Sequence, residues 1–111
     1  MSPRSDLVPG TLEMLVLKTL SLGPLHGYGI AQHIQRLSAD VLRVEEGSLY
    51  PALQRLLAKG WVKAAWKTSP TKRRARYYTL TAAGRRRLGV EESDFARTMD
   101  AIARVLRGSE G

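Results

Sequence analysis

The stretch that decides the fold runs from Gly47 to Gly84 and reads GSLYPALQRLLAKGWVKAAWKTSPTKRRARYYTLTAAG. Its first third is helical, because leucines recur at the spacing of one buried helix face: Leu49, Leu53, Leu56 and Leu57. Ser48 is predicted to cap this helix, with Pro51 in the first turn, where an amide hydrogen is not needed. Lys59 and Gly60 supply a basic last turn and a stop.

Two strands follow this helix. Residues 61–67 and 75–80 are rich in aromatic and branched side chains that alternate along the chain, which is typical of β-strands. Residues 68–74 between them are polar and contain a proline, so they form a loop. The stretch is therefore a helix followed by a β-hairpin with a basic tip.

The flanking sequence adds three more helices. Residues 12–22 and 28–37 are predicted helices separated by Gly23-Pro24, and residues 41–42 are predicted to form a short extended piece. Thr81 is predicted to cap a last helix over residues 82–106. The fold class is mainly α with a small β-hairpin. The expected organisation is a flexible N-terminal arm (1–10), a domain made of three helices and the hairpin (11–81) and a C-terminal helix (82–111).

Charge is segregated along the chain. Residues 47–90 contain eleven lysines and arginines and no aspartate or glutamate, while the whole chain of 111 residues has a net charge of +8. Because helical and strand patterns run through this segment, it predicts a folded basic surface, which suits a polyanion such as nucleic acid. The alternative is a solvated basic face with no partner.

The order of helix, helix, helix and basic hairpin is that of a winged helix-turn-helix, whose third helix enters the major groove of DNA. The residues near the start of that helix and off its leucine face are predicted to read base edges: Ser48, Tyr50, Pro51, Gln54 and Arg55. The cations at the hairpin tip are predicted to contact the flanking phosphates: Lys72, Arg73, Arg74 and Arg76.

The last helix carries an apolar seam at a three–four spacing, interrupted at Glu92: Leu88, Phe95, Met99, Ile102 and Leu106. A terminal helix with such a seam in so small a domain usually has a partner, so these residues are predicted to form a dimer interface. Packing of the seam against the chain's own first helix is the alternative.

Four strings in this order resemble the PadR family of bacterial transcriptional regulators: LHGYGI (25–30), GSLYPALQRL (47–56), KGWV (59–62) and RYYTLTAAG (76–84). The resemblance covers about residues 7–107, and GSLYP is its specific part. It implies a homodimeric, cytoplasmic transcriptional repressor that binds double-stranded DNA and is often released from it by a small hydrophobic effector. The chain is similar to the short branch of the family, with one C-terminal helix.

From that resemblance, an effector, if one exists, is expected to be hydrophobic or aromatic and to bind between the terminal and first helices, where Met14, Phe95 and Met99 are adaptable apolar side chains that could line a slot. A constitutive repressor without an effector and a filled core without a pocket are the alternatives. The other function considered for the fold is a module that binds RNA or a protein partner. A membrane-surface protein is disfavoured by the acids of the last helix. We expect no enzyme activity, no cofactor and no metal site, since the chain lacks cysteine and its two histidines have no paired carboxylate.

Individual residues give further expectations. Tyr28, Tyr78 and Trp61 are predicted to lie in the core, whereas Trp66, near the wing, is left open. The run Arg85-Arg86-Arg87 begins a helix, where cations oppose the macrodipole. It is either a solvated face or a phosphate contact, and the sequence does not decide between them.

Overall fold

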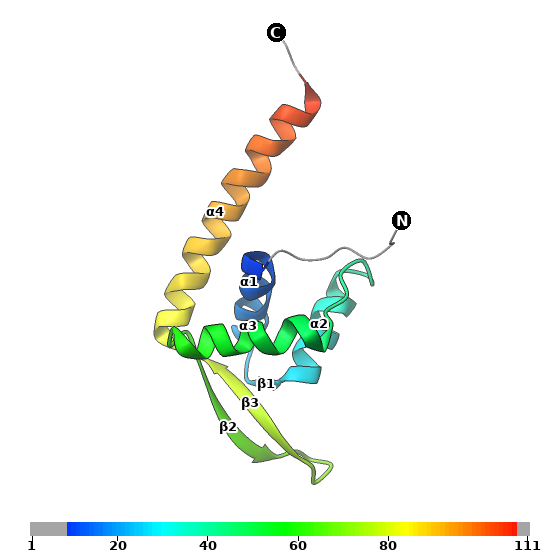
Figure 1. Cartoon of the computed structure of the whole chain (residues 1–111), viewed down its shortest axis with the longest axis vertical. Coiled ribbons are helices and arrows are strands. Elements are labelled where there is room, and N and C mark those ends of the chain that lie inside the picture. Colours follow the sequence, from blue (N-terminus) through cyan, green and yellow to red (C-terminus); the bar gives the residue numbers. More distant parts are fainter. Residues whose placement is uncertain (1–8, 109–111) are drawn as a thin grey trace.

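The computed structural model describes residues 9–108, and its elements confirm the mainly helical fold with a small antiparallel sheet. Figure 1 shows the N-terminal helices clustered together, with the hairpin on one side and a long terminal helix on the other. In chain order the elements are α1 (Pro9–Leu20), β1 (Leu25–His26), α2 (Gly27–Leu37), α3 (Glu46–Ala58), β2 (Val62–Thr68), β3 (Arg74–Leu80) and α4 (Ala82–Arg107).

The element boundaries follow the sequence pattern with three corrections. Helix α1 begins at Pro9, inside the predicted arm, whose residues 1–8 lie outside the described part of the chain. Residues 41–42 form a bend and no strand. The sheet has a third strand, β1, which pairs with β3 through Leu25 opposite Tyr78. A two-residue strand is too short for any alternation to predict it.

The start of α3 was predicted wrongly. The cap is Glu45, whose carbonyl accepts hydrogen bonds from the amides of Ser48 and Leu49, each at 2.9 Å. Ser48 is therefore the third residue of the helix, and Pro51 lies beyond the first turn, within the helix. The acidic Glu46 in the first turn favours this earlier start, because negative charge is stabilised at a helix N-terminus.

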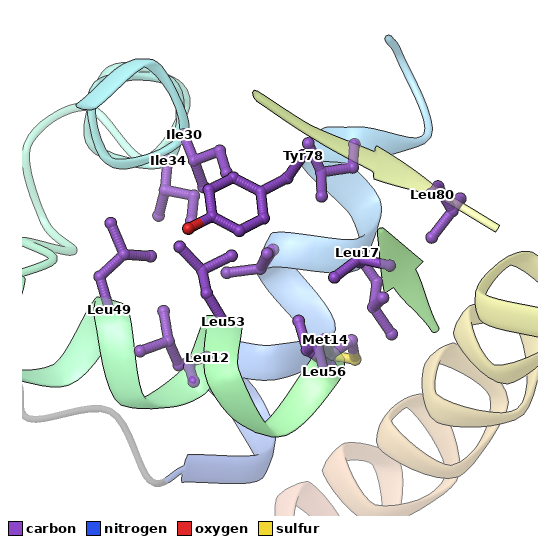
Figure 2. Packing of buried hydrophobic residues seen from close by; sticks show 14 of the residues in the cluster. Leu12, Met14, Leu17, Ile30, Ile34, Leu49, Leu53, Leu56, Tyr78 and Leu80 are labelled. Carbon is purple, nitrogen blue, oxygen red and sulfur yellow. The ribbon is translucent and has the colours of Figure 1, made fainter. Parts of the chain in front are cut away.

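The core lies where the three N-terminal helices meet the sheet (Figure 2). Val16, Ile30, Leu53 and Leu56 are fully buried there. Tyr78 of β3 extends its ring between α2 and α3, so the prediction that it lies in the core is confirmed. The same prediction for Tyr28 is wrong. Its neighbour Gly27 occupies the buried stripe of α2, and the next residue turns about 100° away from that stripe and toward solvent.

Helix α4 is fixed at its N-terminus by contacts to the end of α3. Thr81 caps it, as predicted, by accepting a hydrogen bond from the Gly84 amide at 3.0 Å, and its hydroxyl donates to the Gly60 carbonyl at 2.7 Å. An added Cβ on Gly84 would lie 2.0 Å from the carbonyl oxygen of Trp61, so only glycine allows this close approach. From this anchor α4 extends away from the hairpin (Figure 1). Within residues 9–108, no helix combines the length and apolar character needed to cross a bilayer.

Candidate nucleic-acid interface

The exposed side of α3 carries most of the residues predicted to read bases. Leu49 and Leu53 face the core, and this orientation turns Ser48, Tyr50, Pro51 and Gln54 outward, where all four are exposed. The Tyr50 ring lies against the start of α2. An added Cβ on Gly27 would come within 2.9 Å of its hydroxyl oxygen. Gly27 therefore leaves room at the start of α2 for the aromatic ring of Tyr50 on α3.

Arg55 is placed differently from its neighbours. It is only partly exposed, and its Nε donates to the carboxylate of Glu13 on α1. Glu13 is the more buried partner, and breaking the pair would leave its charge in a partly desolvated position. In the free protein the Arg55 guanidinium therefore joins α3 to α1 and is not an unengaged base-reading group.

The hairpin, which we call the wing, has two different faces. The register pairs Val62 with Leu80, Ala64 with Tyr78, and Trp66 with Arg76, and directly paired residues point to the same face of the sheet. This inner face is apolar at its base and becomes aromatic and cationic toward the tip. Lys63 and Lys67 lie on the outer face.

The wing tip is held by its own turn. The Ser69 amide donates to the Arg73 carbonyl at 2.8 Å, and the Lys72 amide donates to the Ser69 carbonyl at the same distance. Lys72 has a φ of 66°, in the left-handed region. The backbone and the Ser69 hydroxyl make these contacts, so the side chains of Lys72, Arg73 and Arg74 stay exposed.

A groove of about 840 Å³ separates the inner face of the wing from the starts of α2 and α3. Tyr50 lines one wall, and Arg73, Arg74 and Arg76 line the other. The structure therefore brings Tyr50 of the predicted reading helix and three of the four predicted wing cations to one groove. The lining does not include Ser48, Pro51, Gln54, Arg55 or Lys72. Sequence reasoning missed Tyr28 and Trp66, which also line the groove. Two sequence signals could have located them. Tyr28 follows the buried Gly27 and so turns off the buried stripe of α2, and Trp66 lies two residues after Ala64 and so shares its face of the wing.

The electrostatics of the groove are one-sided. No acidic residue lines it, and within residues 9–108 no salt bridge joins a wing cation to a carboxylate. Aromatic rings lie beside the arginines instead, with Arg74 5.6 Å from the Trp66 ring centre and Arg76 5.8 Å from that of Tyr78. Burial raises the pKa of the Tyr78 hydroxyl above its ordinary value, against the opposing charge of Arg76. The Tyr78 hydroxyl therefore stays neutral at ordinary pH and adds no negative charge to the groove.

The run Arg85-Arg86-Arg87 is divided by the fold. Arg87 pairs with Glu91 one turn later and stacks 5.0 Å from the Trp61 ring centre, while Lys59 lies 4.8 Å from the same centre. Trp61 itself is half-buried and packs against the core. Arg85 and Arg86 are exposed. Arg87 is therefore structural, and only the first two arginines are available to a phosphate.

The predicted seam of α4 is largely exposed. Phe95, Met99 and Ile102 are 40–44% exposed, and Leu106 is 80% exposed. Leu88 is the exception. It is 6% exposed within the core of the chain itself, so its assignment to a dimer surface is corrected. Among the residues proposed for an effector slot, Met14 is buried in the core, whereas Phe95 and Met99 lie on the exposed seam.

The histidines have no common site. The Nδ1 of His26 accepts from the Gly29 amide at 3.0 Å and so caps α2. Within residues 9–108, no group of three histidine or acidic side chains is placed to hold a metal ion.

Residues 16–90 match the family model of the PadR-like transcriptional regulators. The chain belongs to this family. The matched segment includes the α3 start and the wing, so the groove lies within the shared part of these transcriptional regulators.

Solved structures agree over most of the chain. A transcriptional regulator from Clostridium thermocellum is similar with a TM-score of 0.81 and 27% identity, over 90% of this chain and 97% of that one. A PadR family transcriptional regulator from Eggerthella lenta is similar with a TM-score of 0.76 and 29% identity, over 90% and 85%. A 37.1 kDa protein in transposon TN4556 of Streptomyces fradiae is 45% identical over 85 residues, which are 77% of this chain and 23% of that protein.

Proposed function

We propose that this PadR-like regulator is a homodimeric, sequence-specific repressor that binds double-stranded DNA in the cytoplasm. The observation that carries the proposal is the shared groove. Tyr50 of α3 and Arg73, Arg74 and Arg76 of the wing line one surface that contains no carboxylate. A helix start in the major groove with the wing on the adjacent backbone matches this arrangement, because base contacts specify and phosphate contacts position.

Specificity is assigned to the exposed residues of α3. Gln54 can make two hydrogen bonds to adenine, and Tyr50 and Pro51 can contact a thymine methyl group. Arg55 would have to leave Glu13 to reach a guanine. We therefore give Arg55 the role of a positioning residue that holds α3 against α1. Ser48 is exposed at the third residue of α3, from where its hydroxyl can meet a phosphate or a base edge.

Dimerisation is assigned to the seam of α4 formed by Phe95, Met99, Ile102 and Leu106. Two recognition helices related by a two-fold axis would read half-sites about 34 Å apart, so the operator would be a pseudo-palindrome. An apolar effector bound between α4 and α1 would release DNA only by favouring a dimer with a different helix spacing. Phe95 and Met99 on the exposed seam are the candidates to line that slot, whereas Met14 is buried in the core.

The proposal is tested by footprinting the promoter upstream of the protein's own coding region, followed by anisotropy titrations with the protected duplex and a scrambled duplex. Gln54→Ala should lower the preference for the protected sequence by roughly 1–3 kcal/mol and leave binding to the scrambled duplex unchanged. Gln35→Ala is the matched control, since Gln35 bonds to Asp40 at the far end of α2. A wild-type protein that binds both duplexes equally would refute sequence-specific binding.

A further inference from the structure

The groove contains more exposed aromatic surface than duplex binding requires. Tyr28, Tyr50 and Trp66 line it and are 67%, 44% and 60% exposed. In a B-form duplex the bases are stacked on one another, so the strand that passes between a wing and a recognition helix offers sugars and phosphates there. In such a complex the exposed aromatic rings of the groove would have no base to stack on. The rings are instead suited to stacking on unpaired bases.

Cations are interleaved with these rings. Trp66 is paired in register with Arg76 on the inner wing face, and Arg74 lies 5.6 Å from the centre of the Trp66 ring. Proteins that bind single strands combine a positive groove with aromatic stacking platforms in this way. The groove volume of about 840 Å³ is also within the range that holds a small organic ligand, so it accommodates a nucleotide.

We propose that this groove binds unpaired nucleotides, with bases stacked on Trp66, Tyr28 and Tyr50 and phosphates held by Arg74 and Arg76. The inference rests on the proposed function only in assigning nucleic acid to this surface. When a base stacks on Trp66, the Arg74 guanidinium leaves the ring and meets the phosphate. Because a single strand and an operator duplex both need Tyr50 and Arg74, they exclude each other.

Trp66 provides a direct reporter. The chain has two tryptophans, so Trp61→Phe leaves Trp66 as the only one, and stacking of a base should quench its fluorescence. The probes are an oligothymidylate of eight nucleotides, thymidine monophosphate and a random duplex long enough to stay paired at the assay temperature. We expect the octamer to quench Trp66, and the duplex to quench it much less.

Affinity measurements test the same point without the Trp61 substitution. Trp66→Ala in the wild-type background should weaken binding of a labelled octamer by about 5- to 150-fold, the effect of one lost stacking platform, and should weaken duplex binding several-fold less. Lys63→Ala is the control, because Lys63 is exposed on the outer face of the wing, away from the groove. It should change octamer binding by less than Trp66→Ala does.

The source of the nucleotide is decided by comparing two probes. Quenching by thymidine monophosphate at concentrations near those of the octamer indicates a free nucleotide, whereas quenching by the octamer alone indicates a single strand. An octamer that fails to bind, or a Trp66→Ala variant that loses octamer and duplex equally, overturns the inference. Specific duplex binding without octamer binding would refute this inference alone. Octamer binding without sequence-specific duplex binding would refute the proposed function alone.

Discussion

Removing the three exposed cations of the wing tip should change how DNA binding depends on salt. The perturbation is Lys72→Ala, Arg73→Ala and Arg74→Ala together. The turn is held by Ser69 and by backbone hydrogen bonds, so the hairpin should keep its shape after this change. The side-chain interaction lost within the protein is the stacking of Arg74 on Trp66, about 0.5–1 kcal/mol at an exposed site.

The magnitude follows from counting phosphates. Three cations in each protomer of a dimer meet about six phosphates, and each phosphate contributes about 0.9 to the slope of log affinity against log salt. The slope should therefore become shallower by about five units. Between 50 and 200 mM salt, the wild type should lose affinity by about three orders of magnitude more than the variant does.

The assay is fluorescence anisotropy with a labelled duplex at several salt concentrations. The control is Arg97→Ala, Arg104→Ala and Arg107→Ala, which removes the same charge from exposed positions on α4. If electrostatics act through local phosphate contacts, the control keeps the wild-type slope. Equal slopes for the two triple variants would show that net charge alone matters, and would refute the assignment of phosphate contacts to the wing.

Three further outcomes are expected from the packing. Phe95→Asp with Met99→Lys should give monomers in sedimentation, because these exposed apolar side chains form the proposed dimer surface. Gly84→Ala should lower the free energy of unfolding by about 1–3 kcal/mol in urea titration, since its Cβ would meet the Trp61 carbonyl at 2.0 Å. Burial raises the pKa of Tyr78, so the unfolded chain ionises first, near pH 10, and the stability of the wild type relative to Tyr78→Phe should fall above that pH, by up to about 1.4 kcal/mol per pH unit.

Each of these outcomes has a matched control. Ser93→Asp with Ala101→Lys introduces the same two charges at exposed positions of α4 away from the seam and should leave the dimer intact. A Phe95 and Met99 double variant that sediments as a dimer would place the interface elsewhere. Gly89→Ala lies on the same helix with open space around its Cβ and should stabilise the protein by about 0.8–1 kcal/mol. An alkaline stability difference that is constant with pH would contradict the shifted pKa of Tyr78.

Local chemistry was enough to predict much of this structure from sequence. The Thr81 cap, the turn between the strands and the leucine face of α3 are all decided by residues within a few positions of one another. The order of these elements predicts the winged helix fold, and the acid-free segment predicts a basic surface.

The start of α3 shows where local reasoning fails. Ser48 and Pro51 are favourable near a helix start, yet the helix begins at Glu46 because Glu45 takes the extended cap conformation. A start at Ser48 and a start at Glu46 lie only two residues apart, and the acidic side chain in the first turn favours the earlier one. The sequence thus contained both possible cap residues, Glu45 and Ser48, but did not show which of them begins the helix.

Tertiary structure alone decided which side chains are available for binding. Glu13 and Arg55 are 42 positions apart, and only the packing of α1 against α3 brings them together. Tyr28 and Tyr78 are the same residue type, but one points to solvent and the other fills the space between two helices. Periodicity within one element specifies a face, whereas the burial of that face depends on distant elements. The sequence by itself therefore determined the elements and the charge of the surface, and only the packing determined the groove between α3 and the wing.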